Sequence, residues 1–356
     1  MSMRRHRSVW LLVATLAVVA GLLLVLRRAH APGEGDLAVQ EIAGEPPRYE
    51  TVLTVMGTEA RLQVVASSAR RARRMFRPAI ERMRGVDRSM STYLPDSEIS
   101  RLNARGSSEA VELSPDMLHV LHKAVEASEL TGGAFDVTYA PLRTLWRAAE
   151  RQNRMPGPEA IEQALAAVGY GKIGFEDGCV RFAVPGMEVD LGGIAKGYAI
   201  ELAAAALQEA GAEAGIVDVG GDLRLFGLPE PGGRWRVAVR RPPGVNKEFV
   251  LAVPGCAVTT SGDYARWFEV EGQHLSHIID PRAGRPVAHM TSVTLVAPDA
   301  TTADALATGV SVMGIHQGLA LVDSLPGVEC MIMERLEDGP LQVHMSSGFS
   351  DLLEGS

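Results

Sequence analysis

Apolar and polar residues alternate along residues 49–65, a pattern typical of two antiparallel strands. The segment reads YETVLTVMGTEARLQVV, and Met56-Gly57-Thr58 at its centre marks the turn. Ser67 or Ser68 then caps a predicted helix that runs to about residue 86. Its apolar face holds Ala72, Phe76, Ile80 and Met83, and arginines fill the other face. That arginine-rich face is either a phosphate-binding patch or a solvated surface, and the solvated surface is the simpler interpretation.

Helical spacing also predicts helices over 115–131, 158–168 and 194–210. From Gly178 onward the pattern changes to short strands mixed with helices. Strands are expected at 180–184, 216–219, 235–240, 248–253, 267–270, 293–296 and 329–333, with further helices at 303–313 and 317–325. Helices and strands do not alternate regularly, and neighbouring strands are close enough in sequence to pair antiparallel. The chain is therefore predicted to be α+β, with mixed or antiparallel sheets and packed helices.

An apolar run near the amino terminus predicts membrane attachment. Residues 9–26 are interrupted only by Thr15 and Gly21, and a helix of this length just reaches across the roughly 30 Å hydrocarbon core. Three arginines precede the run and two follow it, so with the free amine the amino end should stay in the cytoplasm. The rest of the chain would then face the periplasm, held at a bacterial inner membrane.

The segment after this run bears on whether it is cleaved. Ala29-His30-Ala31 has the spacing of a signal-peptidase site, but Pro32 follows directly and the apolar run is long for a signal core. An uncleaved anchor is therefore favoured over a signal peptide. We expect residues 1–31 to be the anchor or signal segment. Residues 32–47, rich in Pro, Gly and Glu, are expected to be a linker.

Composition and charge narrow the function classes. Five of the 35 basic residues lie in the first 28 positions, which leaves 30 basic against 43 acidic residues in the remainder. This acidic balance argues against a nucleic-acid partner. The cysteines at 179, 256 and 330 form no CxxC pair, so neither a disulfide framework nor a cysteine zinc site is expected.

The segment 189–198 (VDLGGIAKGY) can bring backbone close to a ligand. A Gly-Gly turn leads directly into a helix whose free N–H groups favour an anion, and Lys196 in the first turn could reach a phosphate. The alternative is a plain glycine turn with an exposed lysine. The segment lacks both the Walker A and the G-x-G-x-x-G spacing.

Asp304 and Thr308 lie four residues apart in a predicted helix, so both oxygens share one face. A carboxylate and a hydroxyl suit a hard cation such as Mg²⁺. The alternative is local: Asp304 could favour a helix N-terminus, and Thr308 could bond a carbonyl one turn back.

The third candidate segment runs from Thr259 to Pro286. Thr259-Thr260-Ser261-Gly262 is expected to be a polar loop, and His277 precedes an apolar pair and an Asp-Pro turn. A lone histidine there is usually structural. A Ser261–His277 triad lacks the G-x-S-x-G elbow, and a metal pair of His274 with His277 lacks a third ligand.

Two further polar segments lie in the first half. Residues 90–103 read as a polar loop whose Tyr93 could stack on a planar ring. Residues 132–138 offer backbone groups beside Phe135 and Asp136. Each could equally be a well-hydrogen-bonded surface turn.

Taken in order, these segments resemble the ApbE-type FAD:protein FMN transferases, a family of flavin transferases. The resemblance covers about residues 45–350, and seven ordered motifs are far more specific than any one alone. They are M-G-T at 56–58, S-T-Y-x-P-D-S-E-I-S-R-L-N at 91–103, G-G-A-F-D at 132–136, D-L-G-G-I-A-K-G-Y-A at 190–199, G-G-D at 220–222, H-I-I-D-P at 277–281 and A-D-A-L-A-T at 303–308.

The resemblance implies one flavin transferase domain over 48–350, with an FAD cleft between two subdomains. The transmembrane helix predicted from residues 9–26 would precede this domain. In the implied reaction, a Thr or Ser hydroxyl of an acceptor protein attacks the FMN-side phosphorus of FAD. AMP leaves, and FMN stays attached through a phosphoester. Mg²⁺, or Mn²⁺ in its place, would neutralise charge on the pyrophosphate.

The resemblance also implies roles for individual residues. Asp304 and Thr308 would be side-chain metal ligands, and Gly193 would lend its backbone carbonyl. His277 would activate or orient the acceptor hydroxyl. The FAD site would be lined by Met56, Tyr93, Ala134, Phe135, Asp136, Asp190, Lys196 and Ile278.

Partners follow from the family's known clients, which include flavin-bearing subunits of membrane electron-transfer complexes. The chain departs from the family in two ways. Many members use a lipidated cysteine where this chain has an apolar helix, and Asp218 stands where the family often has Asn. Two alternative functions remain: an FAD pyrophosphatase that releases FMN and AMP, and a non-catalytic flavin-binding protein. Asp304, Thr308 and His277 argue against the latter, because storing FAD requires none of them.

Overall fold

The computed structural model describes residues 37–239, 248–262, 267–287, 290–335 and 341–355. Contacts divide the chain into two units, Met1–Val39 and Gln40–Ser356. The helices and strands that follow all belong to the second unit. The apolar run at 9–26 and the cleavage-like site at 29–31 lie outside the described residues, so the transmembrane helix stays a prediction.

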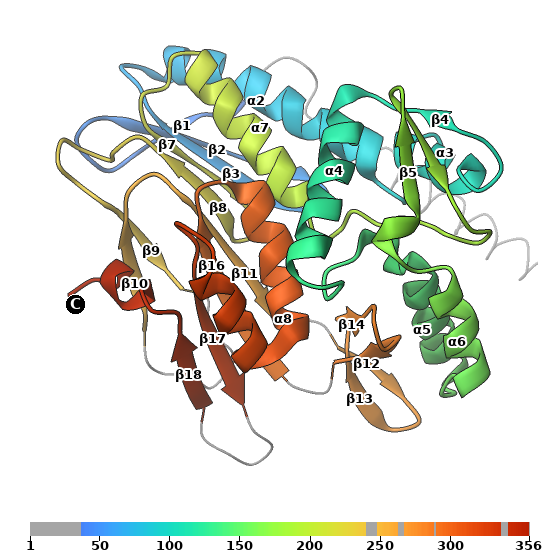
Figure 1. The fold of residues 1–356 in the computed structure, drawn as a ribbon. Coiled ribbons are helices and arrows are strands. Elements are labelled where there is room, and N and C mark those ends of the chain that lie inside the picture. Colours follow the sequence, from blue (N-terminus) through green and yellow to red (C-terminus); the bar gives the residue numbers. More distant parts are fainter. Residues whose placement is uncertain (1–36, 240–247, 263–266, 288–289, 336–340, 356) are drawn as a thin grey trace, which may run out of the picture. The chain divides into compact units, whose positions relative to one another are not determined.

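Nine of the described strands form one antiparallel sheet, which confirms the predicted α+β class (Figure 1). The register fixes two tight hairpins, because Val55 pairs with Thr58 and Val219 with Asp222. In spatial order the strands are β1 (Gln40–Ile42), β2 (Arg48–Val55), β3 (Thr58–Val65), β7 (Gly215–Val219), β8 (Asp222–Phe226), β11 (Ala257–Gly262), β16 (Met290–Ala297), β17 (Glu329–Arg335) and β18 (Leu341–Met345).

Three helices cover one face of this sheet: α2 (Ala69–Met90), α7 (Ala195–Glu209) and α8 (Ala300–Asp323). Ser68 caps α2 as predicted, with its Oγ accepting the Arg71 N–H at 3.3 Å. The two helices predicted at 303–313 and 317–325 are one element, α8, kinked at Gly314, where φ is 75°. α8 is long and apolar enough to cross a membrane, but it packs against β11 and β16, as a core helix does.

The other face of the sheet is covered by a small hairpin, β9 (Trp235–Ala238) with β10 (Val250–Val253), and by the short helix η4 (Phe349–Leu352). Apolar side chains from these elements and from the central strands are buried together. The cluster includes Trp235, Leu251, Val258, Met331 and Phe349. The central strands are therefore buried on both faces.

The remaining elements lie around α4 and α5, beyond the ends of α2 and α8 (Figure 1). A second apolar cluster joins Trp146 and Ile161 to Val270 and Ile279, and so holds two hairpins against the α5–α6 pair. The elements are α3 (Glu98–Arg105), α4 (Pro115–Leu130), η1 (Val137–Tyr139), α5 (Ala140–Gln152), α6 (Pro158–Ala166), η2 (Tyr170–Lys172), the sheet of β4 (Val111–Glu112), β6 (Cys179–Phe182) and β5 (Ile173–Glu176), and the hairpins β12 (Trp267–Val270) with β13 (Gln273–Ser276) and β14 (Ile279–Asp280) with β15 (Arg285–Pro286).

Several sequence predictions need correction. The segment 90–103 is not all loop, because Ser97 caps α3 and accepts the Ser100 N–H at 3.1 Å. Residues 259–262, predicted to be a polar loop, form most of β11 between β8 and β16. α5 was not predicted, although Leu142 and Trp146 give it a buried face. The expected linker at 32–47 contains β1, which pairs with β2.

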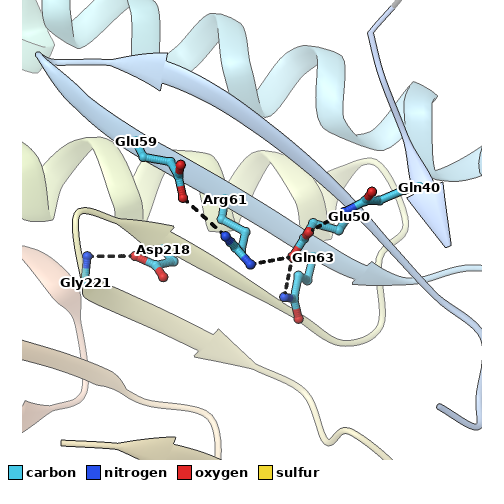
Figure 2. A network of polar contacts seen from close by, with 7 residues as sticks. All are labelled: Gln40, Glu50, Glu59, Arg61, Gln63, Asp218 and Gly221. Carbon is cyan, nitrogen blue, oxygen red and sulfur yellow. Dashed lines mark hydrogen bonds and ion pairs between the residues drawn. The ribbon is translucent and has the colours of Figure 1, made fainter. Parts of the chain in front are cut away.

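The β1–β2–β3 edge carries a polar network centred on Glu50, shown in Figure 2. Glu50 is buried, with 4% of the residue exposed. It accepts hydrogen bonds from Gln40 Nε2 and Gln63 Nε2, each at 2.8 Å, and lies 3.4 Å from Arg61 Nη1. Because a buried carboxylate needs such partners, these contacts hold β1 at the sheet edge.

The helices α7 and α8 cross at Gly197, where there is no room for a side chain. A Cβ at this position would lie 2.1 Å from the Ala300 carbonyl oxygen and 2.7 Å from Asp304 Cβ. Two further contacts tie the helices together. Glu201 on α7 accepts the Ala300 N–H at 2.9 Å, and Asp304 on α8 accepts the Gly197 N–H at 2.8 Å. Each helix thus supplies a carboxylate to the free N–H groups of the other's first turn.

This crossing predicts opposite outcomes for two Gly→Ala substitutions. Gly197→Ala should lower the free energy of unfolding by about 1–3 kcal/mol, because the new methyl group forces the two backbones apart. Gly85→Ala should raise it by about 0.5–1 kcal/mol, since Gly85 lies inside α2 with no atom within 4 Å of the added Cβ. Urea unfolding of the full chain in mild detergent measures both. Equal effects of the two substitutions would show that the crossing is loose.

Candidate functional site

Lys196 in the first turn of α7 lies between two buried carboxylates. Its ammonium forms an ion pair with Asp222 Oδ2 and lies 3.6 Å from Asp304 Oδ1. Both aspartates are 3% exposed. The other oxygens are also used, since Asp222 Oδ1 accepts the Thr260 N–H at 3.1 Å and Asp304 Oδ2 accepts the Gly197 N–H. One ammonium against two carboxylates leaves a net negative charge that favours a further cation.

The three predicted metal ligands, Gly193, Asp304 and Thr308, are brought together by the approach of the Gly-Gly turn to α8. A Cβ on Gly193 would lie 3.3 Å from Thr308 Oγ1 and 3.1 Å from the Phe135 ring. Thr308 Oγ1 also donates to the Asp304 carbonyl oxygen at 3.3 Å. This is the bond to a carbonyl one turn back that the sequence analysis gave as the alternative to metal binding. A carboxylate, a hydroxyl and a carbonyl are an oxygen set of the kind that Mg²⁺ prefers.

Within the described part of the chain, no three Asp, Glu, His or Cys side chains lie close enough together to hold a metal. The predicted set is of a different kind, because it contains one carboxylate and relies on neutral oxygens. Such sites keep waters and take further oxygens from a phosphate-bearing substrate. The donor chemistry therefore fits the metal that the sequence implies.

Asp190 orders the turn that leads into α7. Its Oδ1 accepts the Gly192 N–H at 2.7 Å, and its Oδ2 forms an ion pair with Arg143 of α5. The Asp190 side chain is almost fully buried, and the Arg143 side chain is 22% exposed. The pair thus fixes the Gly-Gly turn to a helix from another part of the chain.

Asp136 is fully engaged within the protein. Its Oδ1 accepts the Thr138 N–H at 2.8 Å and the Thr138 hydroxyl at 2.6 Å, and its Oδ2 accepts the Tyr170 N–H at 2.9 Å. Burial raises the pKa of this carboxyl, and the hydrogen bonds from Thr138 oppose the shift. Ala134 and Phe135 beside it are buried. These hydrogen bonds hold the GGAFD segment in place, and the edge of the Phe135 ring lies next to Gly193.

Met56 lies in a strained turn, whereas Tyr93 lies exposed on the surface. Met56 sits in the β2–β3 turn with φ 52°, a conformation that costs a non-glycine residue free energy, and its N–H donates to Asp87 Oδ2 at 3.2 Å. Tyr93 is 77% exposed, and its hydroxyl accepts from Arg147 Nη2 at 3.3 Å. An exposed ring held in this way is available for stacking on a planar group.

The M-G-T and G-G-D motifs meet at their hairpin turns. The Gly220 N–H donates to the Glu59 carbonyl at 2.9 Å, and a Cβ on Gly220 would lie 2.9 Å from Thr58 Oγ1. Gly220 and Gly221 both have positive φ, as a two-residue turn of this type requires. Asp218, the departure from the family pattern, accepts the Gly221 N–H at 2.8 Å (Figure 2). Asp218 therefore still orders the turn that precedes Asp222.

His277 lies in the bend between β13 and β14, and its side chain is exposed. Ile278 beside it is half-buried. The loop is held by Ser276 Oγ, which accepts the Ile278 N–H at 3.1 Å, and by the following turn, where Arg282 approaches Gly133. The approach of Arg282 to Gly133 places the turn that follows the H-I-I-D-P segment next to the G-G-A-F-D segment.

The structure thus joins Gly193, Lys196, Asp304, Thr308 and Phe135 in one place. Asp190 lies immediately before this group. Two residues of the site were missed from the sequence. Asp222 was visible within the G-G-D motif but was given no role, and Arg143 lies in a helix that the periodicity did not predict.

The fold and this site together define a class of protein. Its members have an α+β fold in which a lysine, in the first turn of a helix that follows a Gly-Gly turn, lies between two buried carboxylates. The model of the ApbE family matches residues 56–332. The FAD:protein FMN transferase of Vibrio cholerae is 35% identical over 305 residues, which is 84% of this chain and 90% of that protein. The Escherichia coli K12 protein of the same name is 31% identical over 276 residues, 75% of this chain and 79% of that protein. The chain belongs to the ApbE family.

Solved structures agree with this assignment. The flavin transferase ApbE from Vibrio cholerae superposes with a TM-score of 0.74 at 30% identity, covering 89% of this chain and all of that one. The ApbE protein from Thermotoga maritima superposes with a TM-score of 0.75 at 33% identity, covering 86% of this chain and 99% of that one. The mixed fold with a mostly antiparallel sheet is thus the fold of these relatives.

The buried Arg143–Asp190 pair makes a pH-dependent prediction. Arg143→Met should lower the free energy of unfolding by about 3 kcal/mol at pH 7, because it leaves Asp190 buried without its cation. The difference in unfolding free energy between Arg143→Met and the parent chain, here called the deficit, should be smaller at pH 5. A buried carboxylate without a partner binds a proton more tightly in the folded than in the unfolded state, so falling pH favours the fold.

The double variant Arg143→Met/Asp190→Asn removes the charge altogether and is the matched control. Its deficit should be smaller than that of Arg143→Met at pH 7 and the same at both pH values. Urea unfolding at pH 7 and pH 5 measures all three chains. A deficit of Arg143→Met that does not change with pH would show that the pair is not electrostatically coupled.

Proposed function

We propose that this chain transfers the FMN moiety of FAD to a Thr or Ser hydroxyl of an acceptor protein and releases AMP. The observation that carries this proposal is the oxygen set of Gly193, Asp304 and Thr308 beside Lys196, at the start of α7. Relatives that share the fold carry the name FAD:protein FMN transferase. A helix start next to a cation site suits a pyrophosphate, which brings negative charge and many acceptor oxygens.

Mg²⁺ is the metal of this proposal, with Mn²⁺ as the alternative, held by Gly193, Asp304 and Thr308. When bound, the metal supplies charge neutralisation on the pyrophosphate. Lys196 adds a fixed positive charge on the same side. In the reaction, the acceptor oxygen bonds to the FMN-side phosphorus, and the bond from that phosphorus to the bridging oxygen breaks. AMP leaves with the bridging oxygen.

His277 takes the proton of the acceptor hydroxyl in this proposal. Its exposed side chain is accessible to a second protein, and its neighbours tie it to the G-G-A-F-D segment. An imidazole suits a base that acts near neutral pH. The flavin would lie in a cleft between two subdomains, against Tyr93, Met56, Ala134, Phe135 and Ile278. Asp136 and Asp190 support this wall through their internal hydrogen bonds.

Location and partners complete the proposal. Residues 9–26 would anchor the chain in a bacterial inner membrane, with the catalytic domain facing the periplasm. Acceptors would be flavoprotein subunits of membrane electron-transfer complexes. An exposed catalytic histidine supports a macromolecular acceptor, because a large acceptor cannot enter a closed pocket.

Intact mass spectrometry of an acceptor tests the proposed function. The full chain in detergent is incubated with FAD, Mg²⁺ and a folded acceptor subunit that carries one target threonine. The acceptor should gain the mass of one FMN less water, and EDTA should abolish the gain. Asp304→Ala should slow transfer by about 100-fold or more, because losing a metal ligand removes several kcal/mol of charge stabilisation.

Asp351→Ala is the control, since Asp351 is an exposed aspartate near the carboxyl end. It should transfer FMN at the unchanged rate. Release of FMN and AMP without a mass gain would replace the transferase by an FAD pyrophosphatase. Binding of FAD with nothing consumed would identify a flavin carrier.

A further inference from the structure

Helix α2 has a charge opposite to that of the rest of the catalytic unit. It contains eight arginines against Glu81 and Asp87. The chain beyond Arg28 has 43 acidic and 30 basic residues, so the part outside α2 is strongly acidic. Such a separation of charge creates a local positive potential on an otherwise negative surface. No step of the proposed reaction uses these arginines.

Four of them form a single row on the outer face of α2. Arg70, Arg74, Arg77 and Arg84 recur at spacings of three, four and seven residues, which places them on one side of a helix. This row, the arginine stripe, is exposed. The buried side chains lie opposite: Ala72, Met75, Phe76, Ala79, Ile80, Met83 and Val86.

The stripe has no acidic partner within the described residues. Arg88 pairs with Glu81 at 2.6 Å and Arg82 lies 3.9 Å from Asp116. The guanidinium groups of the four stripe residues make no ion pair or hydrogen bond with any described residue. Like charges one turn apart destabilise a helix, so the row favours an anion outside the chain.

We propose that the arginine stripe docks on the anionic phospholipid headgroups of the membrane that holds the chain. The inference rests on the membrane attachment proposed above. Only 13 residues, 27–39, separate the apolar run from Gln40. Fully extended, they span at most about 45 Å. This length limits how far the catalytic unit can move from the bilayer surface.

Charge decides which face meets that surface. An anionic bilayer repels the acidic remainder and attracts the stripe, and both effects act within the roughly 8–10 Å over which salt screens charge. Guanidinium groups bind phosphate in a bidentate geometry, which suits lipid headgroups. The stripe thus orients the catalytic unit on the membrane.

Arginine footprinting of the full chain tests this orientation. The protein is reconstituted in nanodiscs of phosphatidylcholine alone, or of phosphatidylcholine with phosphatidylglycerol, and is modified with phenylglyoxal. Mass spectrometry then gives the extent of modification at each arginine. The stripe should be protected about fivefold or more in the phosphatidylglycerol discs, and high salt should remove the protection. Arg151 and Arg181 are exposed on other elements and should react equally in both discs.

Two quadruple variants separate charge from structure. Replacing the four stripe residues by lysine keeps the charge, so Arg151 and Arg181 should react as in the parent chain and the lysines should be protected from acetylation in phosphatidylglycerol discs. Replacing them by glutamine keeps helix propensity and removes the charge. In the glutamine variant, hydrogen exchange of α2 should no longer differ between the two discs.

The membrane anchor is tested separately by flotation with neutral vesicles. If the chain floats with neutral vesicles but the stripe is modified equally in both discs, the docking inference is wrong and the membrane anchor is supported. Failure to float with neutral vesicles would remove the anchor, and the stripe would then stand only if phosphatidylglycerol vesicles still bound the chain. Protection that requires an added acceptor protein would overturn the lipid assignment and make the stripe a protein-docking surface.

Discussion

The close crossing of α7 and α8 at Gly197 is the constraint on which the rest of the site depends. The Ala300 carbonyl leaves no space for a Cβ there, so the two backbones can approach until each helix start receives a carboxylate from the other. Asp304 reaches the first turn of α7, and Lys196 in the same turn is brought to Asp304. The Gly-Gly turn before α7 then meets Thr308. A longer distance between the helices would separate all of these groups.

The electrostatic character of the site follows from this packing. Asp222, Lys196 and Asp304 come from β8, α7 and α8, and each contributes one charge; the two carboxylates are buried, and the Lys196 side chain is 29% exposed. The excess carboxylate is stabilised by backbone N–H groups and by the dipole of α7, and it is available to a divalent cation. Charge, neutral oxygens and a helix start thus lie together, as the proposed binding of a phosphate-bearing substrate requires.

The sequence predicted the fold and the site to different extents. Periodicity located α2 and α4, whose first turns are capped by serines, and the alanine-rich sequence located α7. It failed for β11, whose Thr259, Thr260 and Ser261 look like a loop, because burial in a central strand overrides their polarity. The ordered motifs identified Gly193, Lys196, Asp304 and Thr308. They could not assign Asp222 or Arg143, since each role depends on a contact between segments far apart in the chain. His277 and Tyr93 remain predictions of the motifs, because their roles require the second protein and the flavin.

The most direct test of this account is a double-mutant cycle on FAD affinity. The dissociation constant of FAD is measured for the full chain, Lys196→Met, Asp222→Asn and the double variant. Asp222 is predicted to act by holding Lys196 in place. Asp222→Asn should therefore weaken FAD binding in the parent chain and should not weaken it once Lys196 is methionine, giving a coupling of about 0.5–3 kcal/mol. An equal effect of Asp222→Asn in both backgrounds would contradict the account, because it would mean that Asp222 and Lys196 act independently.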